Sequence, residues 1–297
     1  MYDIIIVGAG PAGLTAALYA CRANKKVLVL EAKSYGGQII NASVIENYPG
    51  IPNISGFDYA TNLYNQVKNL GCEIKFQSVI RVDEDNTVFT NDDKYKADAI
   101  IIATGASNRK LNIPLEDKFI GHGVSYCATC DGHFYKDKVV AVVGGGNTAL
   151  EDALYLADLA SVVYLIHRRD EFRGEDKYLD EIKKKDNIKL ILSSNVTKLN
   201  GVDTLESIEI TNKDGVVDTL EISGLFIAIG QIPLNQIFSN LIDLDENGYI
   251  KSIDGVHTNR DKIYVAGDTK VKELRQLTTA VSDGALAATV AIKELNN

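Results

Sequence analysis

The sequence predicts an α/β fold in which one strand–turn–helix–strand unit occurs twice. Three observations support this prediction. The apolar run 3–7 leads directly into a glycine-rich turn, Gly8–Gly13, and then into an alanine-rich helix. A second apolar run, 139–143, leads in the same way into Gly144–Gly146. One offset relates the two turns and their flanking segments (144 − 8 = 136), so the second unit is an internal repeat of the first.

The composition is that of an ordinary globular chain with an acidic surface. Its 297 residues suffice for about two domains, and 45% hydrophobic with 24% charged residues allow a core in each. The net charge of −9 argues against nucleic acid or an anionic membrane as a partner. No apolar run approaches the ~20 residues that span a bilayer, and no secretory signal follows Met1. With only four cysteines, too few for a disulfide scaffold, we expect a cytoplasmic protein.

The first unit has the sequence features of a dinucleotide-binding site. Its β-branched run 3–7 is typical of a buried parallel strand, 14–23 of a helix, and 27–30 of a second strand that ends in Glu31. In this setting the three glycines of G-x-G-x-x-G make the tight turn, admit a pyrophosphate and let helix and strand pack closely. The helix N-terminus attracts the phosphates, and Glu31 is placed to accept hydrogen bonds from ribose hydroxyls. We therefore expect dinucleotide binding rather than a merely structural turn.

The rest of the first half reads as loops, one helix and short strands. Its expected elements are a glycine-rich loop with Gly36, Gly37 and Gln38, an irregular stretch at 46–50, an amphipathic helix at 57–70, a β-meander at 73–91, a buried strand at 97–103 that ends in Thr104-Gly105, and a connector at 111–114.

Two cysteines separated by two residues follow this connector. Cys127 and Cys130 can close a small disulfide, and a helix N-terminus there would favour the thiolate, which attacks in disulfide exchange. Asp131 follows directly and can carry a proton to or from a departing thiolate. A redox pair is the favoured interpretation, but half of a zinc site or two structural thiols remain open. Zinc needs two more ligands, and Cys21 and Cys72 stand alone in the sequence.

The second unit differs from the first at its last position. Where the first unit has Glu31, the second has His167 (167 − 31 = 136), followed by Arg168, Arg169 and, a turn later, Arg173. A ribose 2′-phosphate repels a carboxylate and binds guanidinium groups, so the first site suits a free 2′-hydroxyl and the second suits NADP(H). A solvated basic patch is the alternative. Two unlike dinucleotides beside a dithiol favour FAD in the first site and NADPH in the second.

The C-terminal part returns, we infer, to the first domain. The expected elements after the second unit are a charged helix at 170–186, a β-meander at 188–222, a strand at 224–230 that echoes 99–105, a connector at 243–248, a strand at 262–266 followed by Gly267-Asp268, and a long helix at 277–295.

These motifs, in this order and spacing, resemble the low-molecular-weight thioredoxin reductases along the whole chain. The most specific part is Cys-Ala-Thr-Cys-Asp ahead of the second glycine turn. The resemblance implies two Rossmann-like nucleotide-binding domains of the three-layer ββα type. The FAD domain would comprise 1–111 and 245–297, and the NADPH domain with the dithiol, 112–244, would be inserted into it. It also implies a homodimer.

The resemblance also implies roles for individual residues. Cys130 would lie next to the flavin, Cys127 would attack the disulfide of thioredoxin, and Asp131 would be the acid–base residue. The implied FAD-binding residues are Gly8, Gly10, Pro11, Ala12, Gly13, Glu31, Gly36, Gly37, Gln38, Asn47, Ala103, Thr104, Gly105, Gly267, Asp268, Arg275, Gln276 and Leu277. The implied NADPH-binding residues are Gly144, Gly145, Gly146, Asn147, Thr148, His167, Arg168, Arg169, Arg173 and Gly230. No metal site is expected.

The implied reaction is that of a thioredoxin-disulfide reductase. NADPH would reduce FAD, FAD would reduce the Cys127–Cys130 disulfide, and the dithiol would reduce thioredoxin by exchange. The alternatives are a ferredoxin-fed reductase or a dithiol oxidase of the same fold, neither of which needs the arginine cluster. Because a dithiol packed on a flavin cannot also meet a protein partner, we expect the inserted domain to swivel about connectors near 112–116 and 243–247.

Overall fold

The computed structural model describes residues 1–42 and 44–297, which form two compact units. The first unit comprises 1–107 and 232–297, and the second comprises 108–231. The chain therefore leaves the first unit once and returns to it. None of the helices in the described ranges is both long enough and apolar enough to cross a membrane.

The first unit is built on a seven-stranded sheet. Its strands are β1 (Tyr2–Val7), β2 (Val27–Leu30), β3 (Glu73–Lys75), β4 (Val79–Val82), β5 (Thr87–Thr90), β6 (Lys94–Ile102) and β17 (Ile263–Val265). The order is β3-β2-β1-β6-β5-β4, with β17 also on β6. β1, β2, β3 and β17 run parallel to the C-terminal half of β6, whereas its N-terminal half pairs antiparallel with β5.

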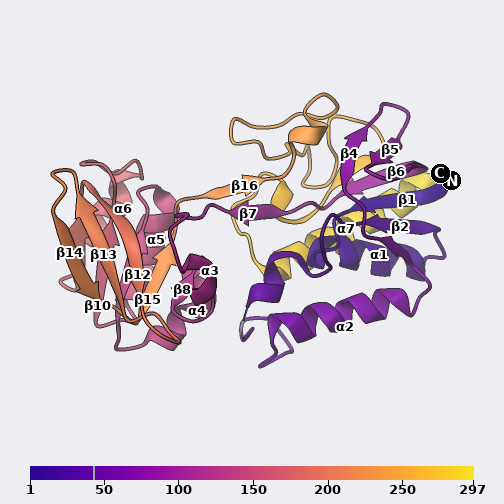
Figure 1. The fold of residues 1–297 in the computed structure, drawn as a ribbon. Helices are drawn as coiled ribbons and strands as arrows, with labels where there is room; N and C mark the ends of the chain where they lie inside the picture. Colours follow the sequence, from indigo (N-terminus) through magenta and orange to yellow (C-terminus); the bar gives the residue numbers. More distant parts are fainter. Residues whose placement is uncertain (43) are drawn as a thin grey trace. The chain divides into compact units, whose positions relative to one another are not determined.

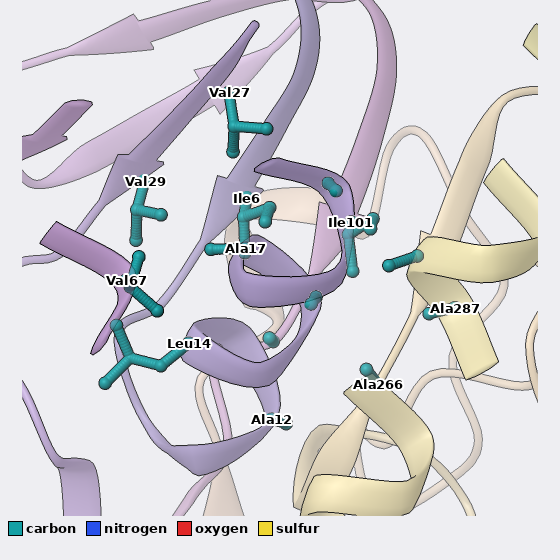
Figure 2. Packing of buried hydrophobic residues seen from close by; sticks show 14 of the residues in the cluster. Ile6, Ala12, Leu14, Ala17, Val27, Val29, Val67, Ile101, Ala266 and Ala287 are labelled. Atoms are coloured by element: carbon teal, nitrogen blue, oxygen red, sulfur yellow. The ribbon is translucent and has the colours of Figure 1, made fainter. Parts of the chain in front are cut away.

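The central strands are buried on both faces because their side chains alternate between two cores. Ile4 and Ile6 of β1 pack with helices α1 (Pro11–Arg22), α2 (Gly56–Lys68) and α7 (Leu277–Leu295). Ile5 and Val7 face the opposite core. Figure 2 shows the helical side, where side chains from β1, β2, α1, α2 and α7 meet. This alternation explains why the run 3–7 has no polar residue after Asp3.

Small residues let α1 and α7 lie side by side (Figure 1). Ala12 of α1 and Ala287, Ala288 and Ala291 of α7 are all buried in the helical core. At Gly284 a Cβ atom would lie 2.1 Å from the carbonyl oxygen of Ala12. The alanine-rich composition of both helices is therefore a requirement of their close contact, not only of helix propensity.

The second unit has a parallel sheet that is also covered on both faces. Its parallel sheet has the order β11-β10-β9-β15-β8, with helices on one face and the antiparallel sheet β12-β13-β14 on the other. The bounds are β8 (Val124–Ser125), β9 (Val139–Val143), α5 (Asn147–Ala157), β10 (Val162–Ile166), α6 (Asp176–Ile182), β11 (Ile188–Ile191), β12 (Ser194–Asn200), β13 (Ser207–Asn212), β14 (Val217–Glu221) and β15 (Gly224–Ile227).

The internal repeat is confirmed down to the register of the strands. Ile4 pairs with Val27 in the first unit, and Val140 pairs with Val163 in the second (140 − 4 = 163 − 27 = 136). Fold class and repeat thus agree with the motifs in the sequence.

Two stretches differ from the expected elements. The helix expected at 170–186 forms only as α6, because the backbone at Arg173 and Gly174 is held on the carbonyl oxygen of Gly145. β3 and β11, expected within meanders, are instead parallel strands at the edges of the two main sheets. Each follows a helix that crosses over the sheet, and a crossover connection produces a parallel strand.

The two units are joined through a pair of short strands. β7 (Ala106–Asn108) and β16 (Gln231–Pro233) form a two-stranded sheet of their own and run side by side (Figure 1). From the sequence, the chain was expected to return to the first unit between residues 244 and 245, but it returns between residues 231 and 232. The reason is packing, since Phe238 and Leu241 are buried in the core of the first unit with Ile5 and Val7.

A histidine clamp fastens the end of α7 to the sheet of the first unit. His257 Nδ1 lies 2.7 Å from Asp254 Oδ2, and its Nε2 lies 2.8 Å from Glu294 Oε1. The hydroxyl of Tyr264 in β17 donates to the other Glu294 oxygen at 2.6 Å. Only a protonated ring can donate to both carboxylates at once.

We expect this clamp to make stability pH-dependent. Glu294, and then Asp254, raise the pKa of His257. The clamp is therefore fully present below the unfolded pKa of about 6.5 and is lost as pH rises through the higher folded pKa. The parent should melt above His257→Gln by roughly 1–2 °C at about pH 5.5, a small gap because the ring is partly exposed, and the two should coincide at about pH 9. Thermal unfolding at both pH values checks this; a gap that widens with pH would contradict it.

Candidate active site

The two cysteines form a disulfide at the start of a short helix. Cys127 is the N-cap residue of α4 (Ala128–Asp131), and its sulfur is bonded to that of Cys130. Both residues are half-buried, while Thr129 between them is exposed. Of the three interpretations that the sequence left open, the structure has the pair joined sulfur to sulfur, not set out as two metal ligands. This disulfide can take part in thiol–disulfide exchange.

The carboxyl group beside the disulfide is held in place by a hydrogen bond. Ser125 Oγ donates to Asp131 Oδ2 at 2.6 Å and accepts from the backbone N–H of Cys127 at 3.0 Å. Burial raises the pKa of Asp131, an effect that the Ser125 hydrogen bond opposes in part. A carboxyl group with a raised pKa, fixed one residue from a sulfur atom, is a candidate for proton transfer. Ser125 was not singled out from the sequence.

A buried glutamate, also missed from the sequence, ties the redox stretch to the preceding loop. Glu116 is 2% exposed. Its two carboxylate oxygens accept from the backbone N–H of Leu111 at 3.0 Å and of Asn112 at 2.8 Å, and from the hydroxyl of Tyr126 at 2.7 Å. Tyr126 directly precedes Cys127. The loop expected to act as a connector is therefore fixed within the second unit.

The first glycine turn lies where β1 meets α1. A Cβ atom at Gly8 would lie 2.3 Å from the carbonyl oxygen of Ala103, and one at Gly13 would lie 1.9 Å from that of Gly8. These two glycines are required by the protein itself. At Gly10, by contrast, the nearest atom to a Cβ is 3.9 Å away, on Gly37. Gly10 therefore leaves room for something other than the protein, as expected where a pyrophosphate approaches the backbone.

The segments expected to bind FAD are brought together in the first unit by direct contacts. Gly36 N–H donates to Ala9 O at 2.8 Å, and Glu31 Oε2 accepts from Ala9 N–H at 2.8 Å. Further hydrogen bonds join the remaining segments: Gln38 to Ala106, Asn47 to Gln276, Thr104 to Thr269, and the Arg275 guanidinium to the backbone oxygen of Asp268. Gly267 lies close to Ala12. Gly105 follows Thr104 in the chain, and Leu277 is the first residue of α7.

One carboxylate oxygen near these segments is buried and lacks a hydrogen-bond partner within the described ranges. Oδ1 of Asp268 is buried and, among the described residues, unpaired; Lys272 Nζ is 3.9 Å from it, too far for a hydrogen bond. Burial raises the pKa of Asp268, which Lys272 lowers in part. Asp283 holds Lys272 at 2.7 Å and Lys270 at 2.9 Å. An orphaned acceptor of this kind fits a ligand hydroxyl.

The second glycine turn has the same architecture. Gly144 would place a Cβ 2.3 Å from the carbonyl oxygen of Ala228, and Gly145 would place one 2.1 Å from the ring of His167. At Gly146, the N-cap of α5, a Cβ meets nothing within 4 Å. Asn147 Nδ2 donates to Glu175 Oε1 at 2.7 Å, and Thr148 is exposed. As in the first turn, two glycines serve the fold and one leaves open space.

Three exposed guanidinium groups lie around a buried imidazole. His167 is 4% exposed, stacks on Phe172, and has an unpaired Nε2 within the described ranges. Its pKa is lowered mainly by burial, and also by Arg173, Arg169 and Arg168. A lowered pKa disfavours a charged ring, so the positive charge of the cluster comes from the three arginines. The expected partner Gly230, with φ +100°, lies two residues past Ala228 at the same sheet edge.

Comparison with known proteins gives one consistent answer. Residues 2–284 match the model of the family described as pyridine nucleotide-disulphide oxidoreductase. The chain is 41% identical over 292 residues to the thioredoxin reductase of Treponema pallidum (strain Nichols). The aligned region covers 97% of this chain and 95% of the relative.

Solved structures agree. A thioredoxin reductase from Streptococcus pyogenes MGAS5005 covers 100% of this chain and 98% of its own, at 39% identity, with a TM-score of 0.96. One from Lactococcus lactis, in a state its title calls the FR conformation, is also 39% identical and covers 100% and 99%, yet its TM-score is 0.68.

Proposed function

The chain belongs to the pyridine nucleotide-disulphide oxidoreductase family, and on that premise we propose that it is a thioredoxin-disulfide reductase. It uses NADPH and FAD, and the observation that carries the proposal is the Cys127–Cys130 disulfide beside Asp131 in the second unit. A ferredoxin-fed reductase or a dithiol oxidase is not favoured, because neither needs the guanidinium groups of Arg168, Arg169 and Arg173.

The residues of each unit fit one of the two nucleotides. In the first unit, the open space at Gly10 and the orphaned oxygen of Asp268 fit a pyrophosphate and a polyol hydroxyl, so we assign FAD there. In the second, the open space at Gly146 and the guanidinium groups around His167 fit a pyrophosphate and a 2′-phosphate, so we assign NADPH there. When bound and reduced by NADPH, FAD supplies the electron pair that opens the disulfide.

The dithiol then acts by exchange. The Cys127 thiolate attacks one sulfur of the thioredoxin disulfide, forming a mixed disulfide and releasing the other sulfur as a thiolate, which takes a proton from Asp131. Cys130 next attacks the Cys127 sulfur, re-forming the internal disulfide and releasing reduced thioredoxin. The Thr129 hydroxyl, 3.5 Å from Cys127 Sγ, can stabilise the attacking thiolate. Ser125 holds Asp131 in position.

We predict that Asp131→Asn separates activity from stability. Since the pKa of Asp131 is raised, the ionised carboxylate disfavours the fold, and this cost is absent below the unfolded pKa and develops as pH rises through the folded pKa. At about pH 7 the variant should be at least as stable as the parent, while thioredoxin reduction falls roughly 10²-fold. Thermal melting and steady-state rates check both. A variant that melts lower and keeps its rate would contradict the role.

A matched pair of glycine variants tests the second site. Gly146→Ala should leave the free energy of unfolding of the ligand-free protein within about 1 kcal/mol of the parent's, since its Cβ meets no atom. It should nevertheless raise the KM for NADPH by roughly tenfold or more. Gly145→Ala should prevent folding, because its Cβ would overlap the His167 ring. Melting curves and NADPH kinetics distinguish the two. An unchanged KM for NADPH in Gly146→Ala would show that Gly146 does not contact the nucleotide.

We further propose that the second unit swivels, with β7 and β16 as the hinge. The stretches expected to flex are held inside the units, 112–116 by Glu116 and 243–247 by Asp245, whose carboxylate accepts from Asn247 and Tyr249 N–H. The difference between TM-scores of 0.96 and 0.68 at equal identity supports more than one arrangement among relatives. A cross-link between the units should stop turnover; full turnover in the cross-linked form would refute the swivel.

The proposal includes a homodimer in the cytoplasm. Two cysteines that remain free, Cys21 and Cys72, are typical of a reducing compartment. Light scattering of the purified protein measures the assembly, and cell fractionation measures the location.

The experiment that tests the function is a coupled assay. Purified FAD-loaded protein, oxidised thioredoxin and NADPH should give stoichiometric thioredoxin thiols, with NADH far less effective. NADPH oxidation that occurs without thioredoxin reduction would contradict the proposal.

A further inference from the structure

The two remaining cysteines meet in the first unit, outside the site described above. Cys21 lies in the last turn of α1, and Cys72 lies between α2 and β3, directly after Gly71. Although 51 positions apart in sequence (72 − 21 = 51), the two residues line the same surface pocket, and each shifts the pKa of the other. Cys72 belongs to the helical core, and Cys21 packs against that core. Neither has a role in the proposed reaction.

Both thiols line one surface pocket of about 370 Å³. Lys25, Lys26 and Glu73 line the same pocket. The volume is many times the ~30 Å³ share of a water molecule, so a small hydroperoxide can enter. Cys21 is partly exposed, whereas Cys72 is buried.

The two thiols are chemically unequal. The neighbouring Cys72 thiol lowers the pKa of Cys21, against an opposing effect of burial. The Cys21 thiol, and then burial, raise the pKa of Cys72. Cys21 is therefore the thiolate former and the more accessible of the two, and Cys72 is the thiol held beside it. This asymmetry is that of an attacking and a resolving cysteine.

We propose that Cys21 and Cys72 are a second redox pair, oxidised by hydroperoxides to an internal disulfide. The Cys21 thiolate attacks the O–O bond of the hydroperoxide, which with one proton gives a sulfenic acid on Cys21 and an alcohol or water. The Cys72 thiol then displaces water from that sulfenic acid and forms the S–S bond. The two thiols lose two electrons, and the O–O bond gains them.

The product would close a loop from the end of α1 through β2 and α2. This loop contains Glu31, Gly36, Gly37, Gln38 and Asn47, the segments that we assign to FAD, so the oxidised pair would tie the FAD-binding loops to the core. A cross-link closing a loop of this length stabilises mainly by restricting the unfolded chain.

The test uses full-length, FAD-loaded protein with Cys127→Ser and Cys130→Ser, which leaves two thiols per chain. Hydrogen peroxide should remove both thiols together and give one linked peptide pair, 21 with 72, within a single chain. Loss of only one thiol, its overoxidation with the other left free, or links between chains would overturn the proposal. Because this variant has no active-site dithiol, the result is independent of the proposed reductase function.

Two single changes in the same background assign the roles. Cys72→Ala should stop the reaction at a sulfenic acid on Cys21 that a dimedone-type reagent labels. Cys21→Ala should leave Cys72 unoxidised at the same peroxide dose. Labelling of Cys72 in place of Cys21 would overturn the assignment. The first experiment, which keeps both Cys21 and Cys72, does not require either of these single variants to fold.

Discussion

Replacing Cys127 or Cys130 by Ser is expected to lower NADPH-dependent thioredoxin reduction by about 10⁴-fold or more. The reason is that an oxygen atom can neither form the internal disulfide nor attack that of thioredoxin. NADPH oxidation with an artificial acceptor that takes electrons directly from the flavin should be retained. Steady-state rates with both acceptors measure the effect, and Cys21→Ser is the matched control because its thiol lies in the other unit.

The same two variants separate the roles of the sulfurs. Cys130→Ser keeps the attacking Cys127 but lacks the sulfur that resolves the mixed disulfide, so it should accumulate a covalent adduct with thioredoxin. Cys127→Ser should form none. Non-reducing electrophoresis distinguishes the variants, and the opposite pattern would exchange the two assignments. Retained thioredoxin reduction in either variant would show that the disulfide is not on the electron path.

Removing the guanidinium groups of Arg168, Arg169 and Arg173 is expected to abolish the preference for NADPH. A charge-assisted hydrogen bond contributes roughly 1.5–3 kcal/mol, so each alanine substitution should lower kcat/KM for NADPH by roughly 10- to 10²-fold. With NADH, which has no 2′-phosphate, kcat/KM should change by less than about threefold. In the described ranges no salt bridge engages these groups, so melting should be unaffected.

Lys189→Ala is the matched control for the arginine variants. Lys189 is an exposed cation on β11, the strand next to β10, but it is not part of the cluster. This substitution should lower kcat/KM only slightly, and by the same factor for NADPH and for NADH. If the arginine variants lose both cofactors to the same extent, the cluster holds the pyrophosphate or the fold instead of the 2′-phosphate.

Local patterns in the sequence were enough to predict the fold class and the two glycine turns. The turns at Gly8 and Gly144 are set by neighbours a few residues away and by one strand contact, and each carries its own signature. The 136-residue repeat then extends from sequence to strand register. The cysteine pair could also be predicted from the sequence, because its two sulfurs belong to a single helical turn.

Residues that act across the chain had no such signature. Glu116 reads as a surface acid among polar neighbours, and only the folded loop reveals that Tyr126 and two backbone N–H groups meet on it. Asp283 lies in the middle of a helix, yet it holds Lys270 and Lys272 from a preceding loop. Such contacts depend on tertiary packing, which neither periodicity nor spacing encodes.

The second domain crossing was misplaced for a related reason. Residues 232–244 were expected to belong to the inserted domain. Their apolar residues recur at i, i+3, i+4, i+7 and i+8, a period that indicates a buried face but not the sheet on which it packs. Phe238 and Leu241 nevertheless fill the sheet face of the first unit opposite its helices. Burial against a distant sheet, not local sequence, decides to which unit this stretch belongs.

The most direct test counts thiols after NADPH is added without oxygen. In the FAD-loaded protein, Cys21 and Cys72 are the two thiols present before addition. One equivalent of NADPH should bleach the flavin only transiently and raise the count to four thiols per chain, the two new ones on the peptide that contains Cys127 and Cys130. A flavin that stays bleached while the count remains at two would contradict the account.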